Sequence, residues 1–324
     1  MARLLRSFFY KISKDITFRI TLIIGGGMAI LMTLLYFLLD RFAGEGFKML
    51  SGQSMLVTSF SPAQNYGIAI PINIVSFVIL EFTQGTIRNK IIAGNSKFKI
   101  YLSLFISGLV LAMSLLLVYV AVCTLLGTVF GGFDMNEVVM FGSTAAFGKV
   151  NAEFIIRFIV LGILSYVSIV SFAVLVATLF RSMGPSIPMI FVGILLFSML
   201  AMIIGASVST IEAMAEVSRS SAVEAIKKIA DPETTPEVVE QLRLMIPEYK
   251  KEFANYQSTL KTLDNVCNVL KCVDPLYGIS TVNVKNGVAT IDDLTFYGGI
   301  CSNIFYGGVF FILGSRFFKK RDIK

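Results

Sequence analysis

Long stretches without charged residues constrain the fold of this chain more than any other feature. Residues 100–130 and 158–180 contain no Asp, Glu, Lys or Arg. A helix of about 20 apolar residues is long enough to cross the hydrocarbon core of a bilayer. Only 15% of the 324 residues are charged, whereas soluble domains average about 25%. The sequence therefore predicts an all-α polytopic membrane protein.

We predict six transmembrane helices, the first five within residues 18–206 and the sixth at 294–315. The first five have the approximate bounds 18–39, 67–82, 100–130, 154–180 and 186–206. The segments 40–66 and 131–153 are predicted to be short connections on one side of the membrane.

Basic residues gather on the other side of these helices. They occupy the N-terminal arm, the connection between the second and third helices, the turn after the fourth helix and the tail 316–324. They are Arg3, Arg6, Lys11, Lys14, Arg88, Lys90, Lys97, Lys99, Arg181, Arg316, Lys319, Lys320, Arg321 and Lys324. Because Lys and Arg are enriched in cytoplasmic loops, this side and both termini are predicted to be cytoplasmic. The net charge of +7 then indicates contact with membrane lipid and a partner, with no role in nucleic-acid binding.

The N-terminal arm, residues 1–17, has an amphipathic pattern. Leu4, Leu5, Phe8, Phe9 and Ile12 recur at helical spacing, with basic residues between them. Such a segment favours a helix lying in the cytoplasmic interface, although a basic flank without helical structure is the alternative.

Residues 207–293 form a polar insert before the sixth helix, predicted to be extracellular and mainly helical. Thr235-Pro236-Glu237 is typical of a helix start, and Pro247 is expected to interrupt the helix that follows. Alternation around Asn286-Gly287 predicts a β-hairpin at 281–291. Cys267 and Cys272 could form a disulfide only if the helix ends or bends between them, and the sequence leaves this open.

Several residues near the ends of the predicted spans could have packing or functional roles. Glu153 and Arg157 are four residues apart and are expected to pair. The sixth helix carries small and polar residues that suit close helix packing or the lining of a substrate path. They are Gly298, Ser302, Asn303 and Gly307.

The chain carries no recognisable catalytic or metal-binding motif. It has no histidine, so neither a Ser-His-Asp triad nor a histidine metal site is expected. The segment GSTAAFGKV at 142–150 resembles a phosphate-binding loop, but its glycines are wrongly spaced and Val150 follows its lysine. We therefore expect neither a metal site nor an enzyme activity in this chain.

The segment EFTQGTIRNKIIAGNSKFKIYLS at 81–103 is polar and basic, and it lies between two apolar stretches. We predict a short cytoplasmic helix at about 84–96 that ends near Gly94, with Glu81 placed to hold it. Residues 81–90, Gly94 and the following Ile100–Ser103 resemble the permeases of type-2 ABC exporters, particularly the bacterial drug and peptide branch.

The resemblance implies a permease subunit of an ATP-driven exporter in the bacterial cytoplasmic membrane. It implies a second permease copy, giving a homodimer, and two copies of a separate ATPase that binds ATP and Mg. The short helix would couple the permease to the ATPase. The implied coupling residues are Glu81, Gly85, Thr86, Ile87, Arg88, Asn89, Lys90 and Gly94. The expected substrate is amphipathic or hydrophobic, such as a drug, an antimicrobial or toxin-like peptide, or a lipid-like compound.

Two other classes are compatible with a polytopic chain. A membrane sensor would bind its ligand in the insert and would have no ATPase partner. An intramembrane enzyme would need paired catalytic residues at matching depth, and the sequence offers no such pair.

Overall fold

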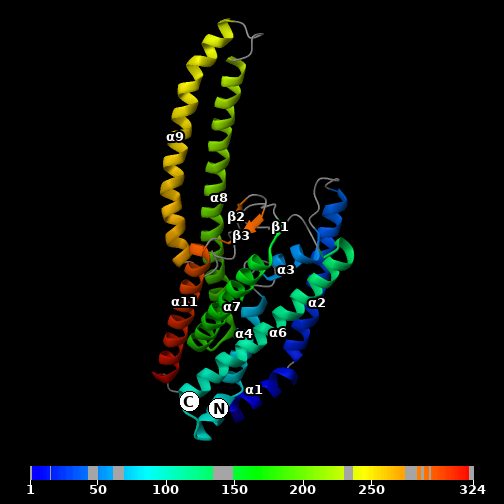
Figure 1. Ribbon diagram of the computed structural model, residues 1–324. Coiled ribbons are helices and arrows are strands. Elements are labelled where there is room, and N and C mark those ends of the chain that lie inside the picture. Colours follow the sequence, from blue (N-terminus) through cyan, green and yellow to red (C-terminus); the bar gives the residue numbers. More distant parts are fainter. Residues whose placement is uncertain are drawn as a thin grey trace. The chain divides into compact units, whose positions relative to one another are not determined.

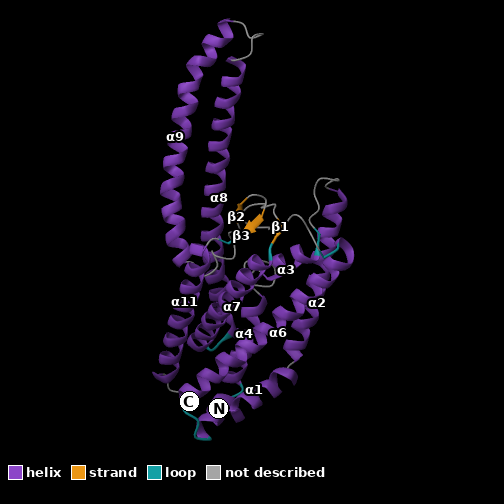
Figure 2. Cartoon of the chain, viewed as in Figure 1, coloured by secondary structure: helices purple, strands orange, loops and turns teal. Residues whose placement is uncertain are grey.

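The computed structural model describes most of the chain, as a predominantly helical protein (Figures 1 and 2). The described residues are 2–14, 16–42, 50–60, 69–133, 149–229, 236–273, 283–285, 288–291 and 293–320. They divide into two compact units. The first unit comprises Met1–Ala201 and Lys271–Lys324, and the second comprises Met202–Leu270.

Long helices dominate the described residues. The helices are α1 (Ala2–Lys14), α2 (Ile16–Phe42), α3 (Gly52–Phe60), α4 (Ala69–Thr83), α5 (Thr86–Ile92), α6 (Lys97–Gly131), α7 (Ala152–Phe180), α8 (Met183–Ile229), α9 (Pro236–Val273) and α11 (Asp293–Lys320). The strands are β1 (Lys149–Val150), β2 (Asn283–Lys285) and β3 (Val288–Thr290). Within the first unit, α6 packs against α2 and α3, and α7 packs against α4 and α11.

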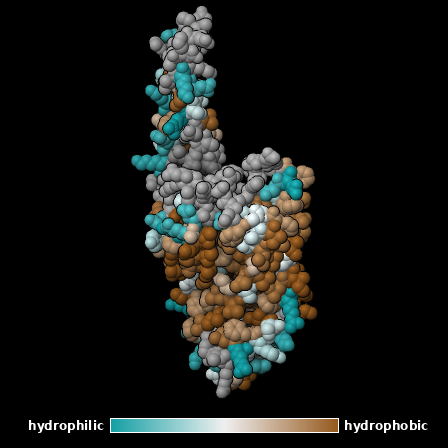
Figure 3. Space-filling view, turned by 45° about the vertical axis from the view of Figure 1, so that its right-hand side comes forward, coloured by the Kyte–Doolittle hydropathy of each residue, from teal (hydrophilic) through white to brown (hydrophobic). Residues whose placement is uncertain are grey.

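The prediction of a multi-pass membrane protein is confirmed at the level of its long apolar helices. Among the described residues, α2, α6, α7 and α11 are each long and apolar enough to cross a membrane, and α4 with α5 forms a fifth candidate bent by 58°. Hydrophobic side chains cover the middle of the first unit on the face shown in Figure 3, with hydrophilic side chains below them. The predicted fifth span at 186–206 lies in α8. The described apolar stretch of this helix is Met183–Leu196, and several side chains after Leu196 are outside the described set. The count of six spans therefore stays a prediction.

The segment 40–66, expected to be a plain connection, contains the short helix α3. Most of its side chains are buried, because α6 has glycines where α3 approaches. A Cβ atom at Gly127 would lie 2.9 Å from the Ser51 carbonyl oxygen, and a Cβ at Gly131 would collide with the Leu50 carbonyl. The apolar pattern of the sequence did not reveal α3, because nine residues are too few to show a helical period clearly.

A small sheet lies at the start of α7 and α11. Strands β2 and β3 pair antiparallel, which confirms the predicted hairpin, although Asn286 and Gly287 themselves lie outside the described residues. Strand β1 adds to the sheet by pairing parallel with β3, so that Lys149 is opposite Val288. This contact joins residues far apart in sequence and was not predicted.

The second unit contains the last part of α8 and most of α9. Helix α9 begins at Pro236, as expected for a proline in the first helical turn. The expected interruption at Pro247 is wrong, because α9 continues through this residue. A proline removes one backbone hydrogen bond and can bend a helix, but the bonds on either side can still carry the helix past it.

Candidate functional site

The polar connection between α4 and α6 folds as a short helix with a defined glycine at each end. Gly85 has a φ of 65° and Gly94 a φ of 82°, both in the left-handed region that glycine adopts without a steric penalty. The amide of Gly85 donates to the Phe82 carbonyl at 3.1 Å. Helix α4 therefore stops, and α5 departs from it at 58°, inside the segment 84–96 that the sequence singled out.

Glu81, at the end of α4, is completely buried. Its Oε1 accepts a hydrogen bond from the Lys11 ammonium at 2.6 Å. Its Oε2 accepts from the Lys90 ammonium at 2.7 Å and from the Thr86 hydroxyl at 2.6 Å. A buried carboxylate is strongly destabilising unless cations and donors surround it, and here both of its oxygens are satisfied. We call these four residues the Glu81 centre.

The two lysines come from different helices. Lys11 belongs to α1 and also donates to the Gln84 side chain at 2.8 Å. Lys90 belongs to α5, and its ammonium lies 3.3 Å from the centroid of the buried Phe8 ring of α1, a favourable cation–π geometry. The Glu81 centre therefore holds α1, α4 and α5 together.

Helix α5 has one side held against the protein and one side free of it. Ile87 is only 1% exposed, whereas Arg88 and Asn89 are exposed. Ile92 is 74% exposed, so the outward side of α5 also carries a large apolar side chain. The predicted coupling residues thus separate into an anchoring set, which includes Thr86, Ile87 and Lys90, and an outward-facing set.

The sequence missed part of this site. It placed Glu81 beside the basic helix correctly but did not identify Lys11, Phe8 and Gln84 as its surroundings. Lys11 is 70 residues from Glu81, and no local pattern connects them. The one available signal was that a lone acid in a strongly basic region needs cations to stay buried.

The small and polar residues of α11 lie mainly at its contact with α7. Gly298 and Ser302 are buried. Asn303 accepts a hydrogen bond from the Ser168 hydroxyl of α7 through its Oδ1 at 3.0 Å. A Cβ at Gly307 would lie 3.5 Å from the same hydroxyl oxygen. The geometry of Asn303 and Gly307 fits close packing of the two helices.

A second group of charges, the Arg157 centre, lies at the start of α7 and α11. Arg157 pairs with Glu153 at 2.7 Å, as expected from their spacing, and with Asp293 at 2.6 Å. It also donates to the Ile291 carbonyl, just after β3, at 3.0 Å. Both carboxylates are largely exposed, at 73%.

The described residues contain no group of three Cys, Asp or Glu side chains arranged to hold a metal ion. Cys267 and Cys272 both belong to α9, but their side chains lie outside the described set. Whether they form a disulfide therefore stays open.

Comparison of the chain with protein-family models, with curated proteins and with solved structures finds no match.

Proposed function

We propose that this chain is the transmembrane permease subunit of an ATP-driven exporter of the type-2 ABC class. One observation supports the proposal most directly. A short amphipathic helix, α5, is held to the bundle on one side by Ile87 and the Glu81 centre. On its other side it presents Arg88, Asn89 and Ile92 to solvent, as a surface that docks a separate protein requires.

The anchoring contacts make α5 suited to transmit a movement. A force on the exposed face passes through Lys90 and Thr86 to Glu81, and from Glu81 through Lys11 to α1. Gly85 and Gly94, both in the left-handed conformation, lie on either side of α5. We therefore expect α5 to move as a rigid helix, with the backbone changing direction at these two glycines. Packed helices that have two stable arrangements can amplify such a shift into a change of access across the bundle.

In this proposal the nucleotide chemistry takes place in the partner. Two copies of a separate ATPase bind ATP and Mg, and two copies of this chain form the path in the bacterial cytoplasmic membrane with their termini in the cytoplasm. The substrate class is an amphipathic or hydrophobic compound, including drugs, peptides and lipid-like molecules.

Charge reversal at Arg88 tests the proposal. The full chain is co-expressed with any ATP-binding-cassette subunit whose gene is found beside its own, and their co-purification and ATP-dependent efflux are measured. We expect Arg88→Glu to weaken the association roughly 30-fold, the effect of losing an interface residue worth about 2 kcal/mol. Lys14→Glu is the matched control, because Lys14 is also exposed and basic but lies on α1.

Unchanged association and efflux in Arg88→Glu would show that α5 is not the coupling helix. If no such ATPase associates with the wild-type chain, the exporter proposal fails. The sensor with a ligand-binding insert would then be the better hypothesis.

A further inference from the structure

Two consecutive residues near the end of α4 contact different parts of the first unit. Glu81 belongs to the Glu81 centre, which holds α1 and α5. The ring of Phe82 packs instead against Phe318 of α11, with their centroids 6.0 Å apart and their planes at 61°. The centroid of the Phe82 ring also lies 5.3 Å from the guanidinium carbon of Arg181, which caps the end of α7. Phe82 therefore extends the contacts of this end of α4 to α7 and α11.

Phe82 is also tied to α5 through its backbone. Its carbonyl accepts the 3.1 Å hydrogen bond from the Gly85 amide that closes the turn between α4 and α5. Gly85 is the residue immediately before α5. Because this carbonyl and the ring belong to one residue, we expect a tilt of α5 about the turn to displace the Phe82 ring as well as Glu81.

The aromatic contacts continue from Phe318 into α6. Tyr101 of α6 is completely buried, and its ring centroid lies 5.8 Å from that of Phe318 and 5.4 Å from that of Phe311. A Cβ atom at Gly314 would collide with Tyr101 Oη, so the glycine permits this close approach. Phe311, Gly314 and Phe318 are three and four residues apart and lie on one face of α11. This face of α11 therefore surrounds the Tyr101 ring.

A further contact holds the end of α11 to the start of α6. The Lys97 ammonium donates to the Lys319 carbonyl at 3.1 Å. These segments lie at the end of the first unit where both chain termini are labelled in Figure 1. Because α11 also packs against α7, a displacement of its end would reach the interior of the bundle.

The Tyr101 hydroxyl is buried and has no hydrogen-bond partner among the described residues. Such a hydroxyl destabilises the arrangement that contains it, and departures of this kind concentrate at functional sites. A shift of α11 that brings an acceptor to the hydroxyl would restore the missing hydrogen bond. The contact of Tyr101 with α11 therefore suits a region that has two arrangements of similar free energy.

We propose that Phe82, Phe318 and Tyr101, which we call the aromatic relay, carry a displacement of α5 to the end of α11. They act as positioning residues, because they move α11 relative to α6 when α5 tilts. The relay adds a second route to the one that runs through Lys11 to α1. It rests on the proposed function only for the source of the displacement, which is the docked ATPase.

Amide hydrogen exchange of the purified full-length protein in detergent, measured by mass spectrometry, tests the relay without an ATPase. Lys90→Met breaks the ion pair with Glu81 and releases α5. We expect exchange to rise about tenfold both in α5 and at the end of α11, because contacting residues are coupled by this order of free energy. In a Phe318→Leu background, Lys90→Met should still raise exchange in α5 but should change it at the end of α11 by less than about twofold.

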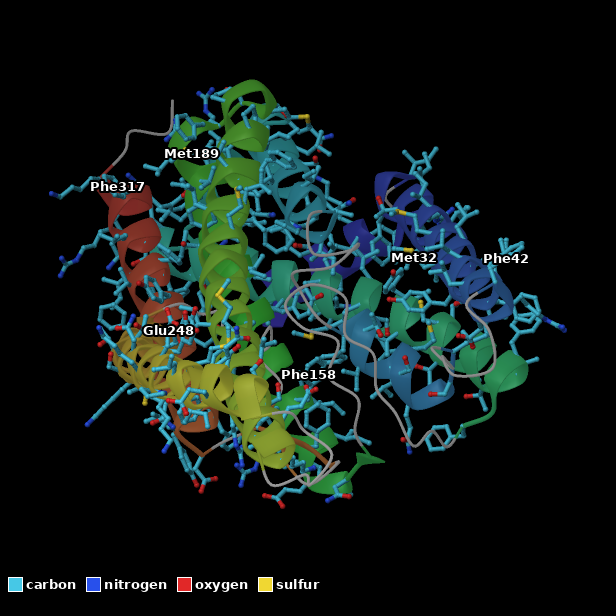
Figure 4. The ribbon with its side chains drawn as sticks, turned by 90° about the horizontal axis from the view of Figure 1, so that it is seen from above. Met32, Phe42, Phe158, Met189, Glu248 and Phe317 are labelled. Carbon is cyan, nitrogen blue, oxygen red and sulfur yellow. The ribbon has the colours of Figure 1, made fainter. Side chains whose placement is uncertain are left out.

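Phe317→Leu is the matched control for Phe318→Leu. Phe317 is the preceding residue of α11 but is 47% exposed, and Figure 4 shows it on the outer edge of the first unit. In this background the response of α11 to Lys90→Met should be the same as in the wild type.

Tyr101→Phe removes only the unpartnered hydroxyl. We expect its unfolding in detergent to match that of the wild type, because no hydrogen bond among the described residues is lost. The response of α11 to Lys90→Met should nevertheless decrease, since the second arrangement no longer gains a hydrogen bond. A purely structural role of the hydroxyl would leave this response unchanged.

Circular dichroism first establishes that each variant is folded, and Thr86→Val replaces Lys90→Met if the latter is not, because Thr86 also donates to Glu81. The inference is overturned if α11 responds equally with and without Phe318→Leu, or if Phe317→Leu blocks the response as well. A rise confined to α5, or no rise in α5 with either releasing variant, would also overturn it. An unchanged response in Tyr101→Phe would remove the second arrangement from the proposal. These outcomes are separate from the co-purification of Arg88→Glu, which tests the exporter proposal itself.

Discussion

The Glu81 and Arg157 centres are built on opposite charge patterns. In the first, one acid lies between two lysines, and in the second, one arginine lies between two acids. Each contains two ion pairs of 2.6–2.7 Å. They differ in burial, since the Glu81 side chain is 1% exposed whereas the Glu153 and Asp293 side chains are 73% exposed.

This difference shows that ion-pair geometry alone does not determine what a charge contributes. Water competes for the exposed carboxylates of the Arg157 centre and screens their attraction. Water cannot reach Glu81, so removal of its charge leaves two lysine ammonium groups facing each other in a poorly hydrated place. The end of the first unit that carries α5 is therefore held by buried charge. The other end combines close backbone packing around α3 with a buried apolar cluster and exposed ion pairs.

Glu81→Gln should have the largest effect. It keeps the shape of the side chain but removes the charge that Lys11 and Lys90 share, and breaking a buried pair costs about 3–5 kcal/mol. The measurement is the free energy of unfolding of the purified protein in detergent. Glu153→Gln is the matched control and should leave this free energy nearly unchanged. If the two variants were equally destabilised, burial would not explain the difference between the centres.

Gly131→Ala should have the next largest effect, because the added Cβ meets the backbone carbonyl of Leu50 rather than a flexible side chain. Overpacking of this kind costs about 1–3 kcal/mol, again measured by unfolding in detergent. Gly26→Ala is the control, since a Cβ there meets nothing within 4 Å. Equal stability of the two variants would show that α3 is not held by its close approach to α6.

Arg157→Gln should have the smallest effect, confined to its own surroundings. Loss of the contacts to Asp293 and Ile291 should speed amide hydrogen exchange in β3, with a smaller change in global stability than either variant above. High salt should weaken the same contacts in the wild type but leave the Glu81 centre intact, because buried pairs are screened much less. Unchanged exchange in β3 would mean that Arg157 does not hold the sheet to α7.

The sequence predicted the features that depend on local pattern. Apolar length predicted the four long apolar helices α2, α6, α7 and α11. A short helix lies between Gly85 and Gly94, where the polar segment indicated one. Alternation around an Asn-Gly pair predicted the hairpin. Each of these signals lies within the segment that it describes.

The remaining features depend on contacts between distant segments. Lys11 reaches Glu81 only because α1 folds back against the end of α4, and Lys97 reaches Lys319 only because α6 and α11 are neighbours. The burial of α3 depends on glycines of α6 that become informative only after the two helices are placed together. For the same reason the sequence could not show that Lys90 anchors α5 while Arg88 faces outward.

The parallel pairing of β1 with β3 has a consequence for how this chain could change in evolution. Strand β1 leads into α7 and β3 lies just before α11, so these two helices are joined by backbone hydrogen bonds that involve nothing from residues 202–270. Those residues form a separate compact unit, inserted in sequence into the first unit. The first unit, which we call the membrane frame, joins α7 to α11 without them. Such an insert can be shortened, exchanged or lost while the frame keeps its fold. Related chains could therefore share the membrane frame and differ widely in the inserted unit.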